Sequence, residues 1–302
     1  MKILIISGFL GAGKTTFIKK MAEMTGLNIM VLENDYSDVG IDKQILQHEK
    51  QVEVWEMLEG CICCSAKADF AASVLTISNT LNPDYLIVEP TGIGRLSTIV
   101  QNIRTVEYER ITLLKPITLI DVNCYDTDFQ KYSDIYKDQV VNADRILFTK
   151  TENVPHYEKE RIKSELLAMG VKGEVDVEHY AYNDEGWWLE LLRDPRDNSL
   201  PITDGDEAET KFESVSYKDV TLDSIGELVM VMQQTIGGAY GDVRRAKGCV
   251  SVNGEDVRFD VVDKRYSIFG EVQADAHNVV FIGNDLDRFE IAAAFGKLGL
   301  AM

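Results

Sequence analysis

The first half of the chain alternates short, almost continuous apolar runs with longer segments of helical periodicity. Apolar runs of this kind are typical of parallel strands that helices cover on both faces. The predicted strands are 2–7, 28–33, 85–89, 117–121 and 145–150. The predicted helices are 14–25, 66–81, 130–141 and 156–169. This order predicts an α/β domain of βα units around a mostly parallel sheet flanked by helices.

The pattern changes at residues 193–210, which contain two prolines, many acids and few large apolar side chains. This composition predicts an acidic linker between a first domain, 1–192, and a second, 211–302. In the second domain the predicted strands are 212–217, 266–269 and 278–283, and the predicted helices are 222–234 and 284–298. Asn253-Gly254 predicts a hairpin turn within 249–262, and Asn284 or Asp285 is the expected cap of the last helix. We expect a smaller α+β domain.

Composition limits the classes of function. The 302 residues include 50 acidic and 31 basic side chains, and the net charge of −19 opposes binding to a nucleic acid backbone. Five cysteines, three of them within four positions, make a poor disulfide framework. No apolar run approaches the roughly 18 residues that a membrane helix needs. We therefore expect a soluble cytoplasmic protein with reduced thiols and neither a nucleic acid nor a membrane as partner.

The segment GFLGAGKT, residues 8–15, fits the phosphate-loop pattern G-x-x-x-x-G-K-[ST] between a predicted strand and a predicted helix. Its glycines allow the backbone amides to point at phosphate oxygens. Lys14 is expected to reach the β- and γ-phosphates, and the Thr15 hydroxyl to bind Mg²⁺. The predicted nucleotide-binding residues of this loop are Gly8, Gly11, Ala12, Gly13, Lys14, Thr15 and Thr16.

Two further segments extend the predicted site. In YLIVEPTG, Glu89 ends a buried strand and is a candidate Mg²⁺ ligand, and the Gly92 amide is a candidate γ-phosphate contact. The predicted catalytic residues are Lys14, Thr15, Glu89 and Gly92. In FTKTE, residues Thr149, Lys150 and Glu152 stand where an N-K-x-D pattern would read guanine through its carboxylate, so GTP is the favoured nucleotide.

Three cysteines in GCICC, Cys61, Cys63 and Cys64, carry the second candidate chemistry. Buried packing residues and a redox pair of Cys61 with Cys64 are alternatives. Thiolates suit Zn²⁺ or Cu(I), whereas Mg²⁺ prefers oxygen ligands, so two different metal sites can coexist. A fourth zinc ligand would come from a carboxylate, water or a second chain. An open metal site is the favoured interpretation, and the isolated Cys124 and Cys249 are expected to be packing residues.

The order of these motifs resembles the CobW-type GTPases, a family of metal chaperones related to the nickel-insertion GTPases of urease and hydrogenase maturation. SGFLGAGKTT and GCICC match its phosphate loop and G-C-x-C-C signature, and NDYSDVGID, residues 34–42, is similar to its switch segment. GDVRRAKGCVSV and VVFIGNDLDRFEI resemble its C-terminal domain. The resemblance implies Asp35 as a fourth ligand of the thiolate metal or a Mg²⁺ partner. This chain departs from the family at TKTE, at Ser37 and in lacking a histidine-rich tract.

The resemblance implies a Mg²⁺-dependent, slow GTPase that binds Zn²⁺ or Co²⁺ at the cysteines and delivers it to a client metalloprotein. The related nickel GTPases add a nucleotide-dependent homodimer as an expectation. We expect GTP to draw the switch segment and EPTG toward the γ-phosphate, and hydrolysis to weaken the metal site. The alternatives are a nucleotide-stabilised metal buffer or sensor, and a P-loop kinase or ATPase whose cysteine loop is structural.

Overall fold

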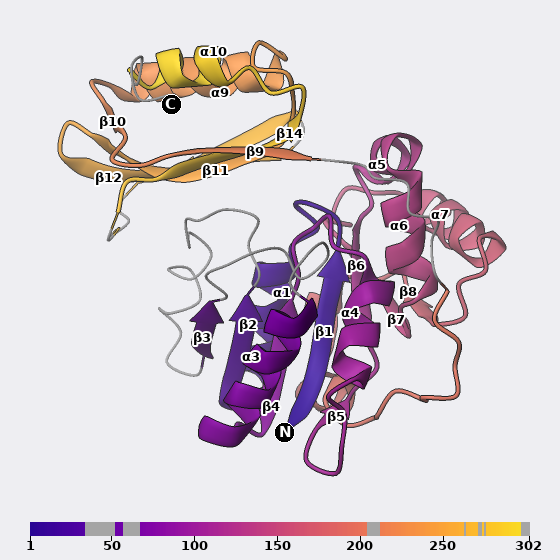
Figure 1. Cartoon of the computed structure of the whole chain (residues 1–302). Coiled ribbons are helices and arrows are strands. Elements are labelled where there is room, and N and C mark those ends of the chain that lie inside the picture. The colour runs from indigo at the N-terminus through magenta and orange to yellow at the C-terminus, as the bar shows by residue number, and fades with distance from the viewer. Residues whose placement is uncertain are drawn as a thin grey trace. The chain divides into compact units, whose positions relative to one another are not determined.

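The computed structural model describes residues 1–33, 52–56, 67–203, 212–262, 264–270, 274 and 276–296. The described residues fall into two compact units, one up to residue 203 and one from residue 212 (Figure 1). Asp35, Ser37, Cys61, Cys63 and Cys64 lie outside the described residues. Among the described helices, none has the length and apolar character needed to span a membrane.

The first unit is built on an eight-stranded parallel sheet. Its strands are β1 (Lys2–Gly8), β2 (Ile29–Glu33), β3 (Val52–Glu56), β4 (Tyr85–Glu89), β5 (Thr112–Leu113), β6 (Ile117–Asp121), β7 (Arg145–Thr149) and β8 (Glu174–Asp176). Their order is β3-β2-β4-β1-β6-β7-β8, and β5 pairs with the first residues of β1. The strands that lead into the nucleotide motifs, β4, β1 and β7, therefore lie close together, with only β6 between β1 and β7.

Helices cover both faces of this sheet. They are α1 (Lys14–Thr25), α3 (Lys67–Thr80), α4 (Leu96–Arg104), α5 (Tyr125–Lys131), α6 (Ser133–Val141), α7 (His156–Ala168) and α8 (Glu185–Leu191), with a 3₁₀ turn, η1, at Tyr180–Tyr182. Phe17 of α1 and Trp188 of α8 pack with Leu4 and Ile6 of β1 in one core cluster. Because side chains alternate along a strand, the buried Ile3 and Ile5 belong to the other face.

The parallel α/β architecture is confirmed, and each of the five predicted strands is present. The pattern missed β3, β5, β8, α4 and α8, all of them short. The predicted helix 130–141 is wrong as a single element, since α5 and α6 meet at Tyr132. Tyr132 has φ −132°, and its buried ring stacks 5.2 Å from that of Phe9. Packing against the loop after β1 thus accompanies the break between the two helices.

The second unit is an antiparallel sheet with two helices on one face (Figure 1). Its strands are β9 (Glu213–Tyr217), β10 (Thr221–Leu222), β11 (Asp242–Val252), β12 (Glu255–Val262), β13 (Arg265–Phe269) and β14 (Val279–Asn284), and its helices are α9 (Ile225–Ile236) and α10 (Arg288–Ala294). The order is β13-β12-β11-β14-β9, with the short β10 parallel to β11. This agrees with the predicted α+β domain.

Two local predictions in this unit have different outcomes. The hairpin is confirmed, because Asn253 and Gly254 have φ of 52° and 84° between β11 and β12, as a type I′ turn requires. The predicted cap of the last helix is wrong. Asn284 still belongs to β14, and the N-cap is Asp287, whose carboxylate accepts from the Phe289 and Glu290 amides.

The start of the predicted linker packs on the first unit. Arg196 is buried, and its Nη1 lies 2.8 Å from the Asn142 carbonyl and 3.0 Å from Asp144 Oδ2. The Thr203 amide donates to Asn142 Oδ1. The domain bounds 1–192, 193–210 and 211–302 stay a prediction.

Candidate functional site

The loop between β1 and α1 has the backbone that a phosphate loop requires. Gly8 has φ 142°, and a Cβ there would lie 2.6 Å from the Leu119 carbonyl oxygen. Gly13, with φ 91°, is the N-cap of α1. The buried Lys14 ammonium lies 3.1 Å from the Gly8 carbonyl and 3.5 Å from that of Phe9. A cation and a helix N-terminus therefore converge at this loop, which suits an anionic ligand.

Thr15 and Glu89 meet although they lie 74 residues apart in sequence. The Thr15 hydroxyl donates to Glu89 Oε1 at 2.9 Å, and Glu89 is buried. They meet because β4 pairs with β1, so that the end of β4 lies beside the start of α1. A hydroxyl and a buried carboxylate are hard oxygen donors, and they fit Mg²⁺.

The turn after β4 contacts the phosphate loop directly. A Cβ on Gly92 would lie 2.5 Å from the Leu10 backbone nitrogen, so only glycine allows this approach. Gln139 of α6 donates from Nε2 to the Gly92 and Gly94 carbonyls at 3.1 and 2.9 Å. The predicted γ-phosphate contact thus lies against the loop that carries Lys14.

The segment after β7 is bonded to the same loop. Thr149 Oγ1 donates to the Ala12 carbonyl at 2.9 Å, and Lys150 Nζ donates to the Gly11 carbonyl at 2.9 Å and to Asp121 Oδ2 at 2.8 Å. Burial alone raises the pKa of Asp121, but the Lys150 charge and hydrogen bonds outweigh it and hold that pKa below its ordinary value. Lys150 therefore ties the predicted base-reading segment to the phosphate loop.

Glu152 has an exposed carboxylate next to this segment. His179 Nε2 lies 3.7 Å from Glu152 Oε1. His179 Nδ1 accepts from the Ala181 amide, which places the proton of a neutral ring on Nε2, facing Glu152. The Glu152 carboxylate is therefore accessible to a nucleotide base, and the Nε2–H group of His179 faces it.

Glu33 and Asp121 belong to this edge of the sheet and were missed by sequence reasoning. Glu33 is buried at the end of β2, in register with Glu89 of β4 and Glu56 of β3. The signal that identified Glu89, an acid ending a buried strand, is present at both missed positions. Three neighbouring strands thus end in glutamate.

Metal ligation by the cysteines is not described, because Cys61, Cys63, Cys64 and Asp35 lie outside the described residues. Within the described ranges, no group of three or more histidine, cysteine, aspartate or glutamate side chains could hold a metal ion. Cys124 and Cys249 are buried, as expected of packing residues.

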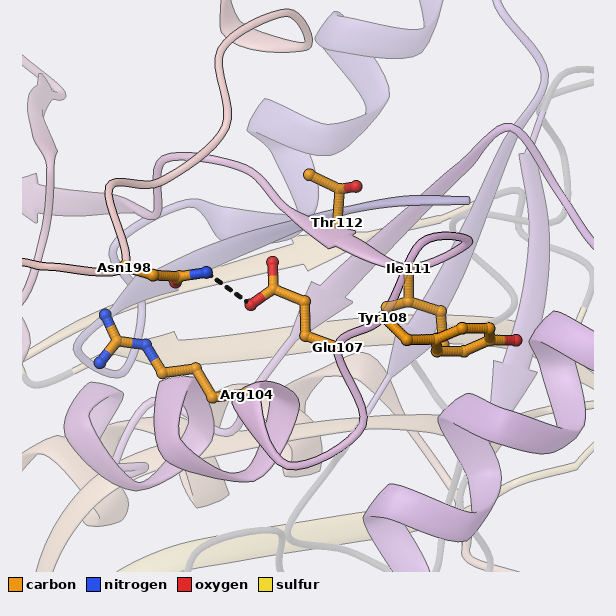
Figure 2. A pocket seen from close by; sticks show the side chains of 6 residues that line it. All are labelled: Arg104, Glu107, Tyr108, Ile111, Thr112 and Asn198. Carbon is orange, nitrogen blue, oxygen red and sulfur yellow. Dashed lines mark hydrogen bonds between the residues drawn. The ribbon is translucent and has the colours of Figure 1, made fainter.

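A separate pocket of about 510 Å³ lies by the start of β5 (Figure 2). Its lining residues are Arg104, Glu107, Tyr108, Ile111, Thr112 and Asn198. Thr112 pairs with Lys2 at the beginning of β1, whereas the phosphate loop follows the end of that strand. The pocket therefore lies where the strands begin, whereas the phosphate loop lies where they end. None of the predicted site residues lines the pocket.

A parallel sheet, a glycine loop opening α1 and a Thr-Glu pair beside it define a P-loop nucleotide-binding protein. The chain belongs to the CobW/HypB/UreG family. The model of the "CobW/HypB/UreG, nucleotide-binding domain" matches residues 2–175, and that of the "Cobalamin synthesis protein cobW C-terminal domain" matches residues 212–298. The resemblance seen in the sequence is confirmed, and so is the GTPase class at the level of the family.

Curated relatives include zinc chaperones. "Zinc chaperone YjiA" of Escherichia coli is 29% identical over 98% of each chain. "Zinc-regulated GTPase metalloprotein activator 1" of Dictyostelium discoideum is 35% identical over 45% of this chain and 32% of that protein. The solved structure of Zn(II)-bound YjiA GTPase from E. coli is 23% identical, with a TM-score of 0.47 over 99% of this chain and 98% of that one.

Proposed function

We propose that the protein is a Mg²⁺-dependent GTPase that binds a transition metal, Zn²⁺ or Co²⁺, at Cys61, Cys63 and Cys64 and transfers it to a client metalloprotein. One observation carries this proposal. β3 ends at Glu56, in register with Glu33, which is in register with Glu89. The chain therefore leaves β3 at the edge of the sheet where Thr15 meets Glu89, five residues before the first cysteine of the motif.

In this proposal each group of residues at the nucleotide site has a separate role. Lys14 and the loop amides balance the charge of the β- and γ-phosphates, and the Gly92 amide contacts the γ-phosphate. Thr15 and Glu89 hold Mg²⁺, which supplies further charge neutralisation when bound. Glu152 accepts from guanine, and Thr149 and Lys150 fix the segment that carries it.

The transferred metal is the cargo of this cycle. Thiolates of the motif favour soft or borderline ions, and relatives named as zinc chaperones support zinc over cobalt. Asp35 stays a candidate fourth ligand or Mg²⁺ partner. Glu33 is a second candidate, because it is a buried carboxylate two residues before Asp35 and lies in register with Glu89 of the neighbouring strand.

The names of relatives support a client protein for this cycle. Two relatives carry the name "metalloprotein activator", which supports a metalloprotein client. A nucleotide-dependent homodimer, slow turnover without a partner and a cytoplasmic location remain predictions.

The test is a titration of Zn²⁺ and of Co²⁺ into the protein with Mg²⁺ and either GDP or a non-hydrolysable GTP analogue. We expect metal affinity to differ at least about fivefold between the two nucleotides, because coupling free energies between two ligand sites are commonly about 1–3 kcal/mol, or roughly 5- to 150-fold. Cys61→Ser, Cys63→Ser and Cys64→Ser should each weaken binding. Cys124→Ser, at a buried cysteine outside the motif, is the matched control.

Other outcomes would favour other functions. Equal metal affinity in both nucleotide states would indicate a buffer or sensor. Unchanged metal binding in all three motif variants would remove the cysteines from the site. Turnover with a small phosphoryl acceptor, independent of the thiols, would indicate a kinase.

A further inference from the structure

The turn that carries Gly92 is bonded to a neighbouring helix. Gln139 is buried in α6, and both hydrogens of its Nε2 have acceptors, the carbonyls of Gly92 and Gly94. The Gln139 backbone carbonyl accepts from the Thr118 hydroxyl of β6 at 2.8 Å. The glutamine is thus attached to the sheet at one end and to the turn at the other.

The preceding residue holds the far end of the same segment. Asp138 is buried, and its carboxylate accepts from the Ser97 amide at 3.1 Å and from the Ser97 hydroxyl at 2.5 Å. Ser97 lies in the first turn of α4, where backbone amides lack partners inside the helix. Two consecutive residues of α6 therefore hold the chain at Gly92, Gly94 and Ser97.

The turn is already closed on the phosphate loop. A Cβ on Gly92 would lie 2.5 Å from Leu10 N, so this position of the turn packs directly against the phosphate loop. Withdrawal would separate the buried Gln139 and Asp138 from their partners and leave donors and acceptors unsatisfied. These hydrogen bonds therefore oppose displacement of the turn when a nucleotide binds.

We propose that Gln139 is a positioning residue that keeps the Gly92 contact preformed in every nucleotide state. It touches no part of the nucleotide and acts through the turn. The inference rests on the proposed role of Gly92 at the γ-phosphate, and it differs from the expectation that GTP draws EPTG inward. Conformational change on GTP binding then takes place outside residues 90–97.

The experiment compares Gln139→Met, which keeps length without donors, with Asn142→Leu. Asn142 is the matched control because it is another buried amide of the α6 region, bonded to Thr203 and Asp138 and to no atom of the turn. Turnover is measured with GTP and Mg²⁺ and without added zinc. Gln139→Met should lower kcat about 10- to 100-fold with KM changed less than about threefold, since misplacing a contact by about 1 Å can cost 100-fold. Asn142→Leu should lower the melting temperature and keep kcat within about twofold.

Hydrogen exchange of residues 90–97 in the wild-type protein tests the same proposal without a variant. Gly92 is set aside, because its own amide gains the γ-phosphate as an acceptor only with GTP. For residues 91 and 93–97 we expect equal protection with GDP and with a non-hydrolysable GTP analogue, and faster exchange in Gln139→Met. Protection of these residues that changes with nucleotide in the wild type, or a kcat loss in Asn142→Leu equal to that in Gln139→Met, would overturn the proposal. Absence of nucleotide binding or hydrolysis by the wild type would instead refute the proposed function.

Discussion

Replacing Gly92 by alanine tests how closely the turn after β4 approaches the phosphate loop. The new Cβ would lie 2.5 Å from Leu10 N, 2.7 Å from Leu10 Cα and 2.8 Å from Leu10 Cδ2. Two of these atoms belong to the backbone, which cannot relieve the clash by changing rotamer as a side chain can. Optimal contacts are about 3.5–4.0 Å, so the two segments must separate by roughly 1 Å.

The size of the effect follows from that separation. Overpacking of this kind costs about 1–3 kcal/mol. A displacement of about 1 Å at a reacting group can cost about 100-fold in rate, which corresponds to roughly 2.7 kcal/mol of barrier. We therefore expect Gly92→Ala to lower kcat for GTP about 30- to 100-fold, and to lower thermal stability as well.

Gly94→Ala separates this steric effect from general damage to the turn. Its Cβ would meet Thr91 O at 3.1 Å, Pro90 Cβ at 3.5 Å and Ile99 Cδ1 at 3.6 Å, and neither glycine has a positive φ. We expect its kcat to stay within about threefold of wild type. GTP turnover at saturating Mg²⁺ and thermal unfolding are measured for both variants. Wild-type turnover in Gly92→Ala, or an equal loss in Gly94→Ala, would refute the reasoning.

Three other predictions concern the same edge of the sheet. Glu89→Gln should raise the Mg²⁺ concentration for half-maximal hydrolysis at least about tenfold, since it removes the charge of a ligand while keeping its shape; an unchanged Mg²⁺ dependence would exclude Glu89 from the site. Glu152→Gln should lower the preference for GTP over ATP about tenfold or more in competition binding, and an unchanged preference would place guanine recognition elsewhere. Asp121→Asn should lower the free energy of unfolding by about 1–3 kcal/mol at pH 6, because the carboxylate loses its charge-assisted bonds from Lys150. Because the folded-state pKa of Asp121 is lowered, its contribution is present above the unfolded pKa of about 3.9 and is lost as pH falls through the folded pKa. The difference in urea unfolding between wild type and variant should therefore shrink progressively as the pH falls below about 4, and a difference that stays constant down to the acid limit of folding would contradict this assignment.

Residues adjacent in sequence could be assigned to the site from the sequence alone. The loop of residues 8–15 was recognisable because its glycines, Lys14 and Thr15 lie together in one turn between one strand and one helix. The hairpin at Asn253-Gly254 was recognisable for the same reason, since its turn type depends on the φ of two neighbouring residues. The break between α5 and α6 was not, because the ring of Tyr132 packs against Phe9, which is distant in sequence.

The partners of those residues depended on the tertiary structure. Thr15 meets Glu89, Lys150 meets Gly11, and Gln139 meets Gly92, across separations of 74, 139 and 47 residues. A sequence shows that a strand ends in an acid, but strand order and register decide which strand lies beside it. Local turns are determined by the conformational preferences of a few residues, whereas this site requires carboxylates, amides and carbonyls from distant strands and helices, which only the packed sheet brings within bonding distance.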